Sequence, residues 1–241
     1  MTSLDREITK QNQKNSIAEP EIAENALKDI YCVSGLGADE RVFQKLKLEG
    51  YQPVHISWLE PQKRETLNDY AKRLTEQIES DCPILIGLSF GGMIAVEIAK
   101  HIKTEKVILI SSVKTRQELP PYFKIFNWLP IHRLIPAKIM LWLGQFLAAW
   151  FFSLENLAER QLFKAILYDT NAKFMKWAID RVVTWKNGIM PENTYHIHGD
   201  SDRIFPFRFV CEDFRIEKGG HFMIMNRAEA VSQLIQKIVA G

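Results

Sequence analysis

Short apolar runs alternate with helical patterns from residue 29 to the C-terminus, and this alternation restricts the fold more than any other feature. Each run has four to seven residues, and the six runs are 29–35, 53–58, 83–89, 106–112, 194–200 and 214–217. Strands of this length between helices are typical of a parallel sheet covered on both faces. Because parallel crossovers are right-handed, we predict an α/β fold with a doubly wound, mostly parallel sheet of about six strands.

The helical segments carry recognisable start signals and apolar faces. Thr66 and Asp69 match a capping box, and apolar residues follow them at helical spacing. Further helices are expected at 91–101, which is strongly apolar, and at about 227–239. In a doubly wound sheet, ligands bind beyond the carboxyl ends of the strands. The residues that follow each strand are therefore the place to look for chemistry.

The chain divides into three parts on composition. Residues 1–27 are polar and form an N-terminal extension, whereas 28–112 and 191–241 carry the strands and make the core. The intervening 113–190 are helical in pattern and rich in aromatic residues, and one crossover does not need so much chain. We interpret 113–190 as an inserted helical cap above the strand ends, with at least half of its aromatic residues forming its own core.

Charge and cysteine content exclude several kinds of partner. The net charge is only +2, which gives no overall field to attract nucleic acid. The three cysteines, Cys32, Cys82 and Cys211, cannot pair completely and show no metal-ligand spacing. They are typical of reduced core residues in a cytoplasmic protein. The polar N-terminus has no apolar core and does not read as a signal peptide.

The longest apolar stretch, 139–152, contains Gly144 and Gln145 and has 14 residues. A transmembrane helix needs about 20 residues, so no transmembrane segment is predicted. Contact of this stretch with a membrane surface is the alternative to burial, but its face is not strongly amphipathic and Lys138 is the nearest basic residue. We therefore expect a buried helix of the cap.

A G-x-S-x-G motif ends the third apolar run: Gly87-Leu88-Ser89-Phe90-Gly91. An apolar strand precedes it and an apolar helix follows it, as in a nucleophile elbow. The turn leaves the Ser89 hydroxyl exposed on a strained corner, and the small residues let strand and helix backbones approach closely. The helix N-terminus offers unpaired N–H groups to a developing oxyanion. The motif predicts a nucleophilic serine, although an inert serine in a tight turn is the simpler alternative.

A nucleophilic serine needs a base, and His221 is the best placed of the six histidines. It lies in a glycine-flanked loop between the last strand and the last helix, at the expected strand-end edge. His196 and His198 lie two residues apart in a strand and so share one face. We expect this pair to pack beneath the site, because a metal site would need a third ligand with clear spacing.

Two aspartates follow the fifth run and could orient the histidine. Asp200 ends the strand, whereas Asp202 lies further into the loop and has more reach toward His221. Aspartate also commonly holds turns through its own backbone, a role that suits Asp200. We assign the acid to Asp202 and keep Asp200 as the reserve.

The chain order Ser89, Asp202, His221 is the nucleophile–acid–histidine order of the α/β-hydrolase superfamily, which this sequence resembles from residue 29 to the C-terminus. The insert 113–190 resembles the variable helical cap of that superfamily. The two N-terminal strands common in larger members are not evident before residue 29.

The resemblance also implies an oxyanion loop after the first parallel strand, at 34–43. Ser34 stands where the family often has histidine, and the backbone N–H groups of Leu36 and Phe90 would form the oxyanion hole. The same loop contains Gly35-x-Gly37, but Glu40 occupies the third glycine position of a dinucleotide fingerprint, so we reject that interpretation.

These features together predict a serine hydrolase that cleaves a carboxylic ester, or a related acyl bond, through an acyl-enzyme. Such chemistry needs no cofactor and no metal. The aromatic cap indicates a small-molecule substrate with an apolar portion. Two alternatives remain: the same residues could run a lyase or acyltransferase reaction, or the fold could be a non-catalytic binding protein.

Overall fold

The computed structural model describes residues 27–136, 139–140, 142 and 150–241. The predicted extension, 1–27, therefore lies outside the described residues apart from Leu27. The strands are β1 Lys28–Val33, β2 Tyr51–His55, β3 Ile84–Leu88, β4 Lys106–Ile110, β5 Thr194–Gly199 and β6 Phe214–Ile216. The helices are α2 Leu67–Leu74, α3 Phe90–Ile98, α4 Pro121–Trp128, α6 Leu157–Asp169, α7 Ala172–Thr184, α8 Met223–Asn226 and α9 Ala228–Ala240. Short 3-10 turns are η1 Glu40–Phe43, η2 Thr75–Gln77, η3 Arg116–Glu118, η4 Ile131–Arg133 and η5 Phe207–Phe209.

The six strands form one parallel sheet in the order β2-β1-β3-β4-β5-β6. This confirms the predicted doubly wound α/β fold. In the sheet, β2 lies on one side of β1 and β3 lies on the other, so the strand order reverses direction at β1. Ligands bind at such a switch point, beyond the strand ends. Val33 pairs with Gly87 there, so the segments after β1 and β3 lie side by side.

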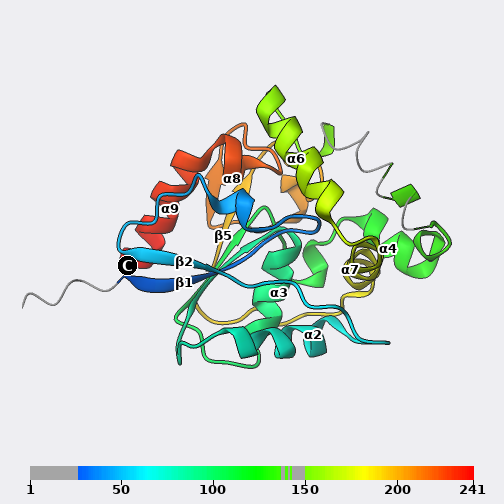
Figure 1. Cartoon of the computed structure of the whole chain (residues 1–241), viewed down its shortest axis with the longest axis horizontal. Helices are drawn as coiled ribbons and strands as arrows, with labels where there is room; N and C mark the ends of the chain where they lie inside the picture. The colour runs from blue at the N-terminus through cyan, green and yellow to red at the C-terminus, as the bar shows by residue number, and fades with distance from the viewer. Residues whose placement is uncertain (1–26, 137–138, 141, 143–149) are drawn as a thin grey trace, which may run out of the picture.

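Helices cover both faces of the sheet (Figure 1): α8 and α9 lie on one face, and α2 and α3 lie on the other. Successive side chains of each strand point to opposite faces of the sheet. Ile30 and Cys32 pack with Ile235 of α9, whereas Tyr31 and Val33 belong to the cluster of α2 and α3. The sheet is thus the middle layer of three.

Most predicted element ends lie within two residues of the observed ones, but β2 differs more. The apolar run 53–58 predicts a strand that ends at Trp58, whereas β2 spans Tyr51–His55. Pairing with β1 sets these ends, since Lys28 lies opposite Tyr51 and Cys32 opposite His55. Trp58 leaves the sheet and packs its ring near Phe90 and Phe174. Pairing with the neighbouring strand, rather than the apolar run, therefore sets the extent of this strand.

The start of α2 follows the predicted capping box, because the Thr66 hydroxyl accepts from the backbone N–H of Asp69 at 3.1 Å. Asn156 and Asn171 cap α6 and α7 in the same way, accepting from Glu159 N–H and from Lys173 N–H. A polar N-cap satisfies backbone donors that the first helical turn leaves unpaired. Local sequence thus fixes where these helices begin.

The segment 113–190 lies between β4 and β5 and carries α4, α6 and α7. It joins both apolar clusters of the core. Phe163 and Leu167 of α6 pack in the cluster of α8 and α9, whereas Phe174 and Ala178 of α7 pack in the cluster of α2 and α3. The insert is therefore continuous with the core rather than a separate layer.

The aromatic residues of this segment divide between buried and exposed positions, and the buried ones pack in clusters that they share with the core. Phe163, Phe174 and Trp185 are buried, but six aromatic side chains among the described residues are exposed: Tyr122, Phe126, Trp128, Trp142, Trp150 and Tyr168. The described residues of the predicted buried helix at 139–152 are mixed: Ile139, Trp142 and Trp150 are each about half exposed, whereas Met140, Phe151 and Phe152 are less exposed. The remainder of that stretch, 141 and 143–149, lies outside the described residues.

The cysteines and the apolar helices also differ in part from, or agree in part with, what the sequence predicts. All three cysteines are free, but only Cys32 is a buried core residue; Cys82 is half-buried and Cys211 is exposed. None of the helices in the described ranges has both the length and the apolar character needed to cross a bilayer.

Candidate active site

Ser89 occupies the turn between β3 and α3 in a strained backbone conformation, with φ 53° and ψ −117°. A positive φ is rare for a residue with a side chain and persists only where the surroundings enforce it. A Cβ atom at Gly91 would lie 2.2 Å from the carbonyl oxygens of Val33 and Ser34, and one at Gly87 would lie 2.5 Å from that of Gly91. Glycine is therefore required on both sides of the serine, which explains the G-x-S-x-G spacing.

His221 reaches Ser89 from the loop between β6 and α8. The Ser89 hydroxyl donates to His221 Nε2 at 2.8 Å, across 132 positions of sequence. Phe152 and Phe205 pack against the imidazole, with ring centroids 5.3 and 5.8 Å away. The ring is 2% exposed, so its orientation is fixed by these two neighbours as well as by its hydrogen bonds. Sequence reasoning identified His221 but not the two phenylalanines that hold it.

Asp202 lies behind the imidazole. His221 Nδ1–H donates to Asp202 Oδ2 at 2.8 Å. The other carboxylate oxygen, Oδ1, accepts from the backbone N–H groups of Ile204 and Phe205 at 2.8 and 2.9 Å. A carboxylate can only accept here, so Nδ1 keeps its proton and Nε2 is left free to take one from Ser89.

Burial alone would raise the pKa of Asp202, because it penalises the charged form. The neighbouring imidazole of His221 and the backbone donors outweigh this effect and hold the pKa below its ordinary value. Asp202 is therefore ionised at neutral pH although it is 4% exposed.

The reserve candidate, Asp200, is engaged elsewhere. Its carboxylate accepts from Arg215 at 2.7 Å, from Ser201 at 3.0 Å and from the backbone N–H of Lys218 at 2.8 Å. These bonds tie the end of β5 to the end of β6. Asp202 rather than Asp200 is thus the carboxylate that contacts His221.

His196 and His198 lie fully buried beneath Asp202. His198 Nε2–H donates to the carbonyl of Phe205 at 2.8 Å, and this nitrogen lies 3.6 Å from Asp202 Oδ2. His198 Nδ1 then accepts from His196 Nε2–H at 3.1 Å. Burial lowers the pKa of both imidazoles. The pair supports the acid from below, and in the described part of the chain no cluster of three or more His, Cys, Asp or Glu side chains could hold a metal ion.

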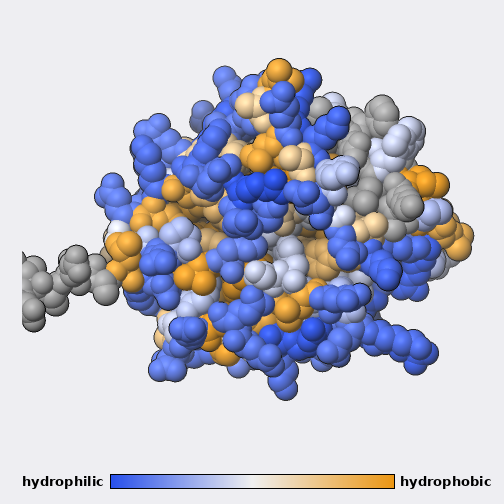
Figure 2. All heavy atoms as spheres, in the orientation of Figure 1, coloured by the Kyte–Doolittle hydropathy of each residue, from blue (hydrophilic) through white to orange (hydrophobic). Residues whose placement is uncertain are grey.

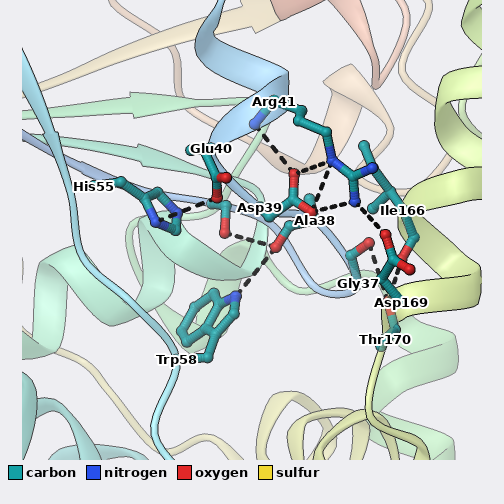
Figure 3. A network of polar contacts seen from close by, with 11 residues as sticks. Gly37, Ala38, Asp39, Glu40, Arg41, His55, Trp58, Ile166, Asp169 and Thr170 are labelled. Carbon is teal, nitrogen blue, oxygen red and sulfur yellow. Dashed lines mark hydrogen bonds and ion pairs between the residues drawn. The ribbon is translucent and has the colours of Figure 1, made fainter.

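The loop after β1 is held in place by several side chains (Figure 3). The carbonyl of Ala38 accepts from the Ser34 hydroxyl at 2.8 Å and from the Trp58 indole at 3.2 Å. Arg41 bonds to Asp39 in the loop and to Asp169 at the end of α6 at 2.8 Å. Sequence reasoning missed these contacts, since Trp58 and Asp169 are distant in sequence and carry no motif.

The backbone N–H groups of Leu36 and Phe90 both lie beside Ser89. Leu36 and Phe90 line the same cavity as Ser89. Phe90 is the first residue of α3, so its N–H has no acceptor within the helix. Among the described residues, none accepts a hydrogen bond from the Leu36 N–H. Both residues thus lie at the cavity that contains Ser89, and their role as oxyanion donors stays a prediction.

A cavity of about 250 Å³ lies over Ser89 and His221. Its walls are otherwise almost entirely apolar and come from both the core and the insert. The insert supplies Phe123, Phe152, Phe163, Ile166, Leu167 and Met175, among others. Such a cavity accepts an apolar group next to the serine hydroxyl.

A larger cavity, of about 560 Å³, is lined in part by the loop that follows β1. Trp58, Lys63, Lys173 and Trp177 line it, and neither Ser89 nor His221 does. This cavity is larger, but only the smaller one is lined by Ser89 and His221. The smaller cavity is therefore the candidate active site.

An α/β fold with a serine at a strand–helix turn, contacted in series by histidine and aspartate, defines a class of hydrolytic proteins. The family model described as the alpha/beta hydrolase family matches residues 30–234. The chain therefore belongs to the alpha/beta hydrolase family.

Solved structures with the same fold support this assignment. A hydrolase from Pseudomonas aeruginosa PA01 superposes with a TM-score of 0.69 at 15% identity, covering 90% of this chain and 91% of that one. A bromoperoxidase from Bacillus anthracis gives 0.67 at 17% identity, with coverage of 89% and 92%. The esterase EaEST from Exiguobacterium antarcticum gives 0.66 at 18% identity, also with coverage of 89% and 92%. At these identities the likeness concerns the fold. Comparison with curated protein sequences gives no match.

Proposed function

We propose that this protein is a serine hydrolase that cleaves a carboxylic ester through an acyl-enzyme. The observation that carries the proposal is the continuous series of contacts from the Ser89 hydroxyl to His221 and on to Asp202, each 2.8 Å long. Membership of the alpha/beta hydrolase family supports hydrolase activity in general, and the esterase among the similar structures supports an ester as substrate.

In the proposed mechanism, His221 Nε2 takes the hydroxyl proton as Ser89 Oγ attacks the ester carbonyl carbon. Asp202 keeps the imidazole in the required tautomer and stabilises its cation. The N–H groups of Leu36 and Phe90 bind the negative oxygen of the tetrahedral intermediate. The imidazolium then protonates the leaving alkoxide, and a water molecule activated by His221 hydrolyses the acyl-enzyme.

We further propose that residues 113–190 act as a cap that selects the substrate. Side chains of this segment form much of the apolar wall over Ser89. The expected substrate is a small molecule that places an apolar acyl or alcohol portion against these side chains. The free cysteines accord with a reducing, cytoplasmic location, which remains a prediction.

Chemical labelling and ester hydrolysis test the proposal. A fluorophosphonate probe should label the wild-type protein and not the Ser89→Ala variant. Hydrolysis of short p-nitrophenyl esters should fall by about 10³-fold or more in Ser89→Ala and in His221→Ala. Ser201→Ala, which removes an exposed hydroxyl from the acid loop, should keep its activity and is the control.

Other outcomes would point to the alternatives. A folded protein that the probe does not label would favour a non-catalytic binding role. Labelling of Ser89 without hydrolysis of any ester in a panel would instead favour a lyase or acyltransferase reaction at the same residues.

A further inference from the structure

The insert carries an exposed apolar surface, which we call the cap face and define as Ile125, Trp128, Leu129, Ile131, Leu134 and Trp150. Trp128 and Leu134 are 83% and 82% exposed, and no residue of α4 is buried. Figure 2 shows hydrophobic side chains at the right-hand edge of the molecule, where Figure 1 places α4. Six large apolar side chains gathered in one region of a surface indicate a contact site rather than scattered exposure.

The charged residues of the segment that carries most of the cap face are all basic. From Leu119 to Leu154 the sequence contains neither Asp nor Glu. Lys124 is exposed and donates only to the carbonyl of Gln117, at 3.4 Å. Arg203 lies over the Trp150 ring at 4.7 Å from its centroid and is also exposed. Within the described ranges, neither cation contacts a carboxylate.

Arg133 contributes less to this charge, because it pairs with Asp180 of α7 at 2.6 Å. His132 bonds to the same carboxylate. The cap face therefore combines exposed tryptophans and aliphatic side chains with two unpaired cations at its border. Tryptophan with lysine or arginine is the combination that suits the interface between lipid headgroups and acyl chains.

We propose that the cap face docks the protein onto an anionic lipid surface. A second copy of the chain fits less well. In a symmetric dimer through this face, Lys124 and Arg203 of both copies would approach one another with no carboxylate of the 119–154 segment to pair with. Phosphate groups of an anionic bilayer supply the missing negative charges, while its acyl region takes the apolar side chains.

The orientation of α4 connects this surface to the cavity over Ser89. Phe123, on the inner side of α4, lines that cavity and packs against Phe205 at 5.8 Å. Tyr122 donates to the carbonyl of Ile204 at 2.5 Å and fixes the helix to the acid loop. Docking would thus bring the cavity close to lipid-borne esters. This consequence rests on the proposed function, whereas docking itself does not.

Vesicle co-sedimentation of the full chain tests the docking. The wild-type protein should sediment with vesicles of phosphatidylcholine mixed with phosphatidylglycerol, and less with phosphatidylcholine alone. The double variant Trp128→Ser/Leu134→Ser should bind the mixed vesicles about tenfold or more weakly, because two exposed apolar side chains are lost. Lys124→Glu should weaken binding several-fold, and only to the anionic vesicles.

Tyr168→Ser is the matched control, since Tyr168 is 85% exposed on α6, outside the cap face. It should bind like the wild type, and circular dichroism should show that all variants are folded. Sedimentation with neither vesicle, equal sedimentation with both, or equal loss in Tyr168→Ser would overturn the proposal. So would a lipid-free dimer that Trp128→Ser dissociates, because the cap face would then be an interface between two copies. None of these readouts depends on the reactivity of Ser89, so they are separable from a failure of the proposed function.

Discussion

At the scale of single residues, close packing fixes the conformation of each side chain in the candidate site. Ser89 keeps a positive φ because Gly87 and Gly91 allow β3, α3 and the loop after β1 to touch. His221 is held between Phe152 and Phe205, and Gly220 packs against the insert, where a Cβ would lie 2.3 Å from that of Ser153. The contacts among Ser89, His221 and Asp202 are therefore formed without a substrate, as the proposed mechanism requires.

The two aspartates of the acid loop give a sharp prediction at this scale. Asp202→Asn should lower kcat for p-nitrophenyl esters by about 10⁴-fold, because an amide at this position favours the wrong imidazole tautomer. Asp200→Asn should change kcat by only a few-fold, since it loses the bond to Arg215 at the surface. Steady-state kinetics on both purified variants provides the measurement. A comparable loss in Asp200→Asn, with Asp202→Asn near normal, would refute the assignment of the acid.

At the scale of elements, the loop after β1 is fitted between the core and the insert. Gly37 has φ 70°, and a Cβ there would lie 3.0 Å from Met175 Cε and 3.2 Å from Leu167 Cδ2. The Gly37 carbonyl also accepts from the Thr170 hydroxyl at 3.4 Å. The end of α6 and the start of α7 therefore set the position of Leu36, whose N–H is the proposed oxyanion donor.

Gly37→Ala should therefore lower kcat roughly tenfold or more and change KM less, because the displaced Leu36 N–H acts on the transition state. Gly50→Ala is the matched control: Gly50 has φ 80°, but nothing lies within 4 Å of the added Cβ. Both variants should lose about 1 kcal/mol of stability from backbone strain. Thermal unfolding and kinetics on the pair separate strain from displacement, and equal kcat values in the two variants would contradict the proposed role of the loop.

At the scale of the whole molecule, aromatic packing joins the insert to the core, and a half-buried group of charged side chains joins two parts of the insert to each other. Phe174 and Trp177 of α7 pack among Trp58, Tyr70 and Phe90 of the core. Within the insert, Asp180 bonds to His132, Arg133 and Arg181. Partial burial of this carboxylate raises its pKa, but the hydrogen bonds to Arg133, His132 and Arg181 outweigh that effect and lower the pKa to about 2.

This shift predicts how stability responds to acid. A carboxyl with a lowered pKa in the folded state stabilises the fold above its ordinary pKa, and loses that effect as the pH falls through the folded value. Asp180→Asn should cost about 1 kcal/mol at pH 7, allowing for solvent screening, and the difference from wild type should shrink between about pH 4 and pH 2. Urea unfolding at several pH values measures this. Asp81→Asn is the control, since Asp81 is exposed and lies outside the insert. Its stability should match that of the wild type at every pH. A stability difference between Asp180→Asn and the wild type that persists undiminished at pH 2 would contradict the linkage.

The sequence alone determined the class of fold and the residue types of the site. Short apolar runs, the Thr66 cap and the glycines around Ser89 act through neighbours in the chain, so their consequences can be read locally. The same holds for the expected place of His221, since parallel strands end at one edge of a sheet.

Only the tertiary structure decided the remaining features. The sequence favoured Asp202 as the acid on reach alone, whereas the engagement of Asp200 by Arg215 and Lys218 appears only in the structure. The extent of β2 follows from its ladder with β1, and the exposure of Trp128 follows from how α4 sits on the acid loop. Each of these features depends on contacts between distant segments of the chain. An apolar pattern indicates that a side chain favours burial, but it does not indicate which residues will cover it.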